Sequence, residues 1–270
     1  MNDTYIVAAY VIIDDLLQIM NHNDDVRTNV SAAEIMIVAV VSSRYFQNNH
    51  ERALYIMRHL GYVSKISISR FNRRLHALAE VSWYLLTMIG ELLSKGSIFA
   101  IDSMPLPVCK RVRAQRCRKV KEKRFWGYCA AKEDYYFGWQ LHLICDTQGV
   151  PVAFEMLPAS WHGLVPLQEM LALLPSGSQV VADKGYVSQK DEIICYHYGN
   201  VRLIPRYRKG MRISNTKAEL QLINKHRPMI ETVNSQLEKM GIQRPHARTN
   251  HGFAIKVLTS LIALAFNNIL

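Results

Sequence analysis

The order of apolar and polar positions predicts helices throughout the first third of the chain. Residues 1–95 contain no proline, and their apolar residues recur at helical spacing. Ser31, followed three residues later by Glu34, forms the pattern of a capping box, so we expect a helix over 32–45. This part is therefore predicted to be an all-α domain.

A second helix is predicted over 52–60, ending at Gly61, and a third carries Phe71, Leu75 and Leu78 on one face. Two helices joined by a glycine-containing turn are typical of a helix-turn-helix motif that binds DNA. A plain helical bundle with arginines on its wet face remains the alternative. The basic residues that lie off the apolar face are Arg70, Arg73, Arg74 and His76.

From residue 96 onward the pattern changes to short apolar strands alternating with helices. This order predicts an α/β domain with a mixed five-stranded sheet and flanking helices. The predicted strands are 97–103, 135–146, 150–157, 179–183 and 201–205. The predicted helices are 163–174, 188–198, 228–240 and 253–269, and Pro228 is expected at a helix start.

Charge changes the picture because it is unevenly distributed. The chain has 33 Lys and Arg against 22 Asp and Glu, a formal net charge of +11. Residues 110–124 hold nine basic residues and one acidic residue, and 201–270 hold twelve and three, whereas 125–200 are acidic overall. We expect the segment 110–124, called the basic arm, to contact a DNA backbone beside the active site. Its basic residues are Lys110, Arg111, Arg113, Arg116, Arg118, Lys119, Lys121, Lys123 and Arg124.

Several classes of protein are disfavoured. Half of the residues are apolar (49%), which excludes wholesale disorder. The start of the chain lacks the cationic segment of a signal peptide, and the apolar runs are short for a membrane span. Five widely spaced cysteines indicate reduced thiols, not a zinc site. We expect a cytoplasmic, nucleoid-associated bacterial protein.

Three carboxylates are candidates for metal chemistry. Asp102 and Asp183 end predicted strands, and Glu231 borders the apolar stripe of a predicted helix. Carboxylates gathered at strand ends next to basic surfaces suit Mg²⁺-dependent phosphodiester chemistry. Asp146 and Glu155 are rivals, but the first lies in a hairpin turn and the second in mid-strand.

The segments 100–103, 182–186 and 227–232 together resemble the DDE transposases of bacterial insertion sequences. The stretches 101–109 and 127–132 resemble the insertion-sequence 982 family most closely. The resemblance implies an RNase H-like catalytic domain at 96–270, preceded by a helical DNA-binding domain at 1–95. It further implies an acidic triad of Asp102, Asp183 and Glu231, which cleaves element ends and joins the freed 3′-OH to target DNA. Two Mg²⁺ ions per site, which Mn²⁺ can replace, are expected.

Four further residues have expected roles in contacting DNA. Arg227 matches an arginine four residues before the glutamate in related groups, and we expect it to contact a phosphate or to orient Glu231. Its alternative is a helix-terminal arginine in an ion pair with a surface acid. Those groups carry a lysine seven residues after the glutamate, whereas here Glu238 takes that position and the lysine is Lys239. Lys184 follows an acid of the triad, and its alternative is a solvated lysine. Trp161 is a candidate for stacking on a displaced base, although tryptophans at such junctions are more often core residues.

Two alternatives to a transposase remain open at this stage. One is a non-catalytic or domesticated DNA-binding protein, and the other is an RNase H-like nuclease that cuts without joining ends. As partners of a transposase we expect double-stranded DNA, both terminal inverted repeats and target, and a second copy in a dimer or larger assembly. We expect neither a membrane nor a nucleotide cofactor as a partner.

Overall fold

The structure, a computed structural model, describes residues 1–270 apart from the side chain of Ala131. Its contacts divide the chain into two compact units, which are 1–92 together with 236–270, and 93–235. The expected division was 1–95 and 96–270. The last helix groups with the N-terminal helices because it is apolar on most of its faces and packs against them.

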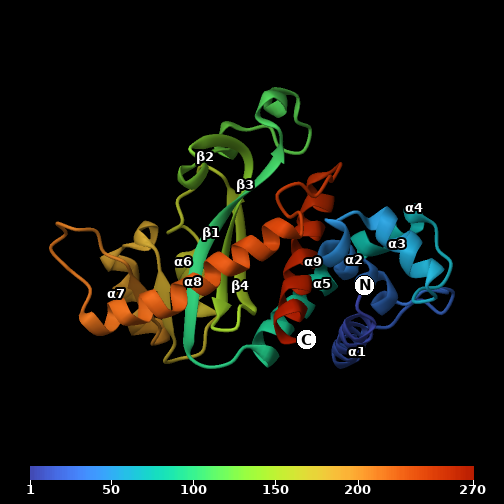
Figure 1. Cartoon of the computed structure of the whole chain (residues 1–270), viewed down its shortest axis with the longest axis horizontal. Coiled ribbons are helices and arrows are strands. Elements are labelled where there is room, and N and C mark those ends of the chain that lie inside the picture. The colour runs from blue at the N-terminus through green and yellow to red at the C-terminus, as the bar shows by residue number, and fades with distance from the viewer. The chain divides into compact units, whose positions relative to one another are not determined.

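The first unit consists of helices, as the sequence predicted. Ser31 and Glu34 form the expected capping box, with bonds of 3.0 and 2.6 Å, and Gly61 takes a positive φ of 81° just after the third helix. Phe71 and Leu75 are fully buried, as predicted. The helices are α1 (Asp3–Ile19), α2 (Ala32–Phe46), α3 (His50–His59), α4 (Ile68–Ala77), α5 (Ala79–Leu93) and α9 (Asn250–Ile269) (Figure 1).

Two apolar helices, α2 and α9, form the centre of this unit. By length and composition alone α9 could cross a membrane, but 67% of its apolar stretch is buried within the protein. Such burial is typical of a core helix. The Nδ2 atom of Asn48 donates to the Met240 carbonyl and to Oγ of Ser260, both at 3.1 Å, so this buried amide is satisfied.

The second unit is built on a six-stranded mixed sheet. One strand more is present than predicted, because the four residues of β2 lie directly behind the basic arm and show little pattern of their own. The path is β2-β3-β1-β5-β6, with β4 pairing β3, consistent with the expected RNase H-like fold. The strands are β1 (Ile98–Cys109), β2 (Trp126–Cys129), β3 (Asp134–Asp146), β4 (Pro151–Pro158), β5 (Gln179–Ala182) and β6 (Arg202–Pro205) (Figure 1).

Helices cover the two faces of this sheet. Alternate residues of β1, such as Phe99 and Ile101, share a buried cluster with residues of α6 (Leu167–Ala172) and α7 (Gln189–Gly199). The neighbouring Asp102 points to the opposite face, where it meets α8 (Lys217–Lys239). Short 3₁₀ turns complete the unit: η1 (Arg111–Arg116), η2 (Lys123–Phe125), η3 (Ala130–Lys132) and η4 (Lys184–Tyr186).

Three predicted elements have different lengths in the structure. The first strand continues to Cys109 because it pairs with β3 over its whole length. Helix α6 is only six residues long and begins after Pro166. Helix α8 begins eleven residues before Pro228, which lies in its interior, so the expected start was wrong. Thr216 and Glu219 form the capping arrangement that starts this helix, with bonds of 2.9 and 3.2 Å.

Candidate active site

The register of the sheet brings Asp102 and Asp183 together. Strands β1 and β5 run parallel and pair as far as Ile101 and Ala182. Asp102 and Asp183 directly follow this last pair along the chain, so both lie at the same end of the parallel ladder. Asp183 comes one residue after the end of β5 and does not itself end the strand, whereas Asp102 lies inside the longer β1, at the point where pairing with β5 stops.

Asp102 is the most enclosed of the three acids. Its Oδ2 atom accepts a hydrogen bond of 3.0 Å from Nδ2 of Asn234 on α8. Burial raises the pKa of Asp102 to about 6. The backbone N–H of Ser103 and the guanidinium of Arg227 act in the opposite direction, while the carboxylates of Asp183 and Glu231 raise this pKa further.

Arg227 connects the other two acids. Its guanidinium lies 3.0 Å from Oε1 of Glu231, one helical turn later, and 3.7 Å from Oδ2 of Asp183. Only 26% of its side chain is exposed, so the cation is partly shielded from water. Both partners of Arg227 therefore belong to the predicted triad, and neither is the separate surface acid that we named as its alternative.

The two rival carboxylates have other surroundings. Asp146 is completely buried, and its oxygens accept hydrogen bonds from the backbone N–H groups of Lys95, Gln148 and Val150 at 2.9–3.0 Å. It therefore fixes the hairpin between β3 and β4. Glu155 lies on β4 with an exposed side chain.

The types of side chain at this site suit a divalent cation, but the distances between them do not yet form a metal site. Three carboxylates share one neighbourhood, and burial disfavours the charged form of one of them, which a hard cation would relieve. Among the described residues, however, no group of three His, Cys, Asp or Glu side chains is close enough together to hold a metal ion. Arg227 instead lies between two of the acids.

Comparison with known proteins places this arrangement in a family. Residues 94–251, more than half of the chain, match the family model described as "Transposase DDE domain". The chain belongs to the DDE transposase family. Membership implies the use of a divalent metal ion.

One curated relative is the "Transposase for insertion sequence element IS1106" of Neisseria meningitidis serogroup B. It is 25% identical over 149 residues, which cover 51% of this chain and 50% of the relative. The chain thus spans about half the length of the curated relative that it matches. No solved structure matches the chain. These matches support a bacterial insertion-sequence transposase, and the narrower insertion-sequence 982 assignment stays a prediction.

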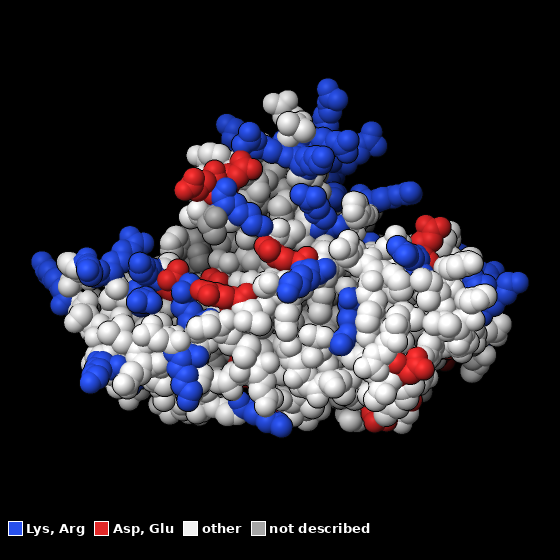
Figure 2. All heavy atoms as spheres, in the orientation of Figure 1, with Lys and Arg blue, Asp and Glu red and all other residues white. Residues whose placement is uncertain are grey.

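The basic arm of this DDE protein begins where β1 ends. Since β1 runs seven residues beyond Asp102, the arm starts about 23 Å from that acid. We had expected the arm to lie directly beside the active site, and its start does not. Figure 2 shows its cations gathered at the tip of the second unit. Arg111 pairs with Asp134 and Arg124 with Glu122, both at 2.8 Å. Eight of the nine basic side chains are exposed, and Lys119 is half-buried and donates to the Val108 carbonyl.

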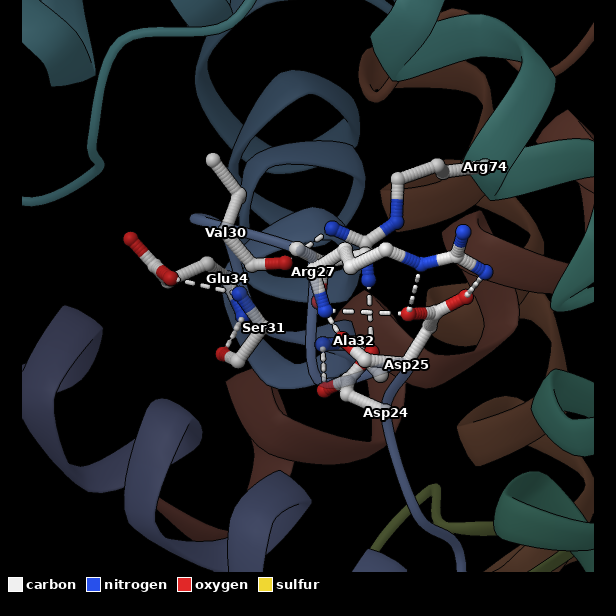
Figure 3. A network of polar contacts seen from close by, with 9 residues as sticks. Asp24, Asp25, Arg27, Val30, Ser31, Ala32, Glu34 and Arg74 are labelled. Atoms are coloured by element: carbon white, nitrogen blue, oxygen red, sulfur yellow. Dashed lines mark hydrogen bonds and ion pairs between the residues drawn. The ribbon is translucent and has the colours of Figure 1, made fainter.

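The three arginines predicted to bind DNA from α4 differ in their surroundings. Arg70 and Arg73 are exposed. The guanidinium of Arg74 turns inward, as Figure 3 shows, to the carbonyl of Val30 and, at 2.6 Å, to Oδ1 of Asp24. Oδ2 of the same aspartate accepts from the Ala32 N–H at 2.7 Å. Arg74 therefore connects α4 to the start of α2. Its predicted contact with DNA stays a prediction.

The remaining predicted residues lie at the surface. Lys184 is exposed in η4, directly after Asp183, and Lys239 is exposed in the last turn of α8. Trp161 follows β4 with 40% of its side chain exposed, so it is not the core residue that we named as its alternative. Its stacking on a base stays a prediction.

Two residues near the triad were missed by sequence analysis. Asn234 lies three residues after Glu231, so both are on one side of the helix. This spacing is the sequence signal that could have identified Asn234. Tyr186 ends the turn that begins at Asp183, and its hydroxyl lies 3.2 Å from Nδ1 of the buried His142. No local pattern indicates this contact, because β3 supplies the histidine.

Proposed function

We propose that this chain is an insertion-sequence transposase that cleaves element ends and joins the freed 3′-OH to target DNA. The observation that carries the proposal is the placement of Asp102 and Asp183 at one end of a parallel ladder, within electrostatic reach of Glu231. Carboxylates in this position on an α/β sheet are suited to phosphodiester chemistry.

Asp102, Asp183 and Glu231 would hold Mg²⁺, two ions per site, with Mn²⁺ as a substitute. The bound metal supplies activation of the attacking oxygen and stabilisation of the leaving oxygen. Asn234 holds the carboxylate of Asp102 in a fixed orientation through its 3.0 Å hydrogen bond. The raised pKa of Asp102 supports the binding of a cation, because it indicates that the buried carboxylate has too little positive charge around it.

Arg227 has a second task in this proposal. Its guanidinium now neutralises Glu231 and Asp183, a task that a divalent cation would take over. Released from the carboxylates, the same guanidinium can bind a phosphate of the DNA through two parallel N–H groups. Lys184, next to Asp183, adds a further cation for the backbone.

The basic arm grips DNA at a distance from the cleaved bond. Its start lies about 23 Å from Asp102, which corresponds to about seven base pairs at the 3.4 Å spacing of a strand.

Trp161 lies on the same unit and would stack on a base displaced near the cleaved bond. On the other unit, exposed Arg70 and Arg73 of α4 would contact the terminal inverted repeats. Synapsis of two ends calls for at least a dimer.

The test is a cleavage and joining assay with purified protein, DNA carrying the element's own ends, and Mg²⁺ or Mn²⁺. We expect metal-dependent nicking and joining, lost in Asp102→Asn, Asp183→Asn and Glu231→Gln while DNA binding persists. Glu155→Gln is the matched control, because it neutralises an exposed carboxylate on β4, outside the triad. Unchanged nicking in a triad variant removes that residue from the site.

The same assay distinguishes the alternatives. A pre-cleaved end that is never joined to target DNA, although intact ends are cut, indicates a nuclease without strand transfer. Footprinting of the ends without any metal-dependent cleavage, by protein shown to be folded, indicates a DNA-binding protein without catalysis. Either outcome overturns the proposal.

A further inference from the structure

Three aromatic residues, which we call the aromatic surface, are exposed on one face of β2 and β3. Trp126 and Tyr128 alternate on β2 and so share a face, and Tyr135 on β3 pairs directly with Tyr128. The three residues are 37%, 55% and 58% exposed, in this order, and the rings of the two tyrosines lie 5.0 Å apart between centroids. Cross-strand pairing explains the contact between the tyrosines, but it does not require three neighbouring rings to face water.

The backbone beneath the aromatic surface is closely packed. The ring of the buried Phe137 lies 5.2 Å from that of Trp126. Gly127 fits against the turn after β4, because a Cβ there would come within 2.8 Å of Ala159. The same turn carries Trp161, the residue already expected to stack on a base. The rings are therefore held in place before a ligand arrives, which lowers the entropy cost of binding.

Positive charge lies next to the aromatic surface. Residues 110–135 hold ten basic residues and three acidic residues. The basic arm begins directly after Cys109, which pairs with Phe137, so the arm and the aromatic surface share one end of the sheet (Figures 1 and 2). Two of the three acids, Glu122 and Asp134, are already paired with arginines. Exposed rings beside a basic segment are typical of surfaces that bind single-stranded nucleic acid.

The aromatic surface also lies on the face of β3 that carries the active site. Leu143 pairs with Asp102, and every second residue from Leu143 back to Tyr135 points to the same face. Tyr135 is eight residues from Leu143 along the strand, a distance of about 27 Å, or about eight stacked nucleotides at 3.4 Å each. A DNA strand held at Asp102 can therefore reach the rings without crossing the sheet.

We propose that the aromatic surface binds unpaired bases of a DNA strand by stacking, while the basic arm holds the phosphates of that strand. The bases of a duplex are covered by their neighbours, so only an unpaired base presents its whole face to a protein ring. A second copy of the chain fits less well, because docking face to face would bring two basic arms together. That the strand comes from an opened element end rests on the proposed function.

The test is fluorescence anisotropy without metal, at about 0.15 M salt, with a labelled oligothymidylate of about 20 nucleotides and a duplex of the same length. We expect Tyr128→Leu and Tyr135→Leu each to weaken single-strand binding at least about fivefold, because each removes a stacked ring. Duplex binding should stay within about twofold, since the charges remain. Tyr128→Phe keeps the ring and should keep full affinity. The matched control is Tyr198→Leu, which removes an exposed tyrosine of α7.

A second measurement needs no variant. An oligothymidylate that carries iodouracil should crosslink on irradiation to a residue of the aromatic surface, identified by mass spectrometry. Crosslinks only at other residues overturn the proposal. Unchanged single-strand affinity in both leucine variants, shown to be folded by their melting temperatures, also overturns it. So does a loss of self-association in these variants, which would identify the face as an interface between copies.

Failure of this inference can be told from failure of the proposed function. If the wild type binds oligothymidylate through these rings but does not cut element ends, the proposed catalysis fails while the aromatic surface stands. If the wild type cuts and joins ends while both leucine variants bind single strands like the wild type, only the aromatic surface fails.

Discussion

The side chain of Asn234 on α8 donates a hydrogen bond of 3.0 Å to Oδ2 of Asp102 on β1, joining residues 132 positions apart. This contact ties the helix that carries Glu231 to the strand that carries the first acid. An amide that orients a metal-ligating carboxylate tunes metal affinity without touching the metal itself.

Replacing Asn234 with alanine should therefore weaken metal use. We expect the metal concentration for half-maximal cleavage to rise about 10–100-fold, the usual effect of losing such a contact. The measurement is a Mg²⁺ titration of cleavage at saturating DNA. Ser235→Ala, an exposed neighbour on the same helix, is the control and should leave the titration unchanged. An unchanged titration for Asn234→Ala as well would show that the hydrogen bond does not orient Asp102.

Arg74 should contribute to stability more than to DNA affinity. Arg74→Ala removes hydrogen bonds to Asp24 and to the Val30 carbonyl and leaves both acceptors without this partner. We expect a loss of about 2 kcal/mol in the free energy of unfolding, measured with urea. Arg73→Ala, one position earlier and exposed, should change stability by less than about 0.5 kcal/mol but weaken DNA binding. Equal stabilities for the two variants would contradict the role assigned to Arg74.

Gly138 should be irreplaceable on packing grounds. It lies opposite Pro107, where the register between β1 and β3 shifts. A Cβ at this position would overlap the Leu106 carbonyl and come within 2.8 Å of the Val108 backbone nitrogen. We expect Gly138→Ala to lose about 3 kcal/mol in unfolding free energy, because backbone cannot move aside as a side chain can.

A matched glycine provides the comparison. Gly199 ends α7 and would meet only Val201 at an ordinary 3.6 Å, so Gly199→Ala should be neutral or slightly stabilising. Thermal unfolding of both variants checks the pair. Wild-type stability in Gly138→Ala would mean that β1 and β3 do not approach each other in this register.

His50 should make the protein sensitive to acid. Burial lowers its pKa to about 3 from 6.5, and the nearby positive charge of Lys256 acts in the same direction. Below pH 6.5 the unfolded chain therefore binds a proton at this position that the folded chain does not bind. Stability due to His50 is thus present above pH 6.5 and is lost as the pH falls toward 3.

At pH 5 this loss should amount to about 2 kcal/mol. Urea unfolding at pH 7 and pH 5 measures it, and His50→Gln, which cannot titrate, should show a smaller drop between the two pH values. Parallel stability curves for wild type and variant would show that the folded protein binds the proton at this histidine too.

Much of the local structure could be predicted from sequence because its causes lie within a few residues. The capping box of Ser31 and Glu34 and the end of α3 at Gly61 depend on neighbours along the chain, and both predictions are confirmed. The predicted start of α8 was wrong, because Pro228 was taken as the first residue of the helix and the capping pair of Thr216 and Glu219, also a local signal, was overlooked.

The sequence by itself determined the α/β class, the helical first part, the clustering of positive charge and, through the family resemblance, the three candidate acids. Only the tertiary structure decided what those groups contact: that Arg227 joins Glu231 to Asp183, that Asn234 holds Asp102, and that Arg74 faces inward. It also placed 236–270 with the N-terminal helices. The physical reason is distance along the chain, because caps, turns and apolar periodicity depend on residues within one or two helical turns of each other. The partner of a charged side chain is instead set by which distant elements pack together.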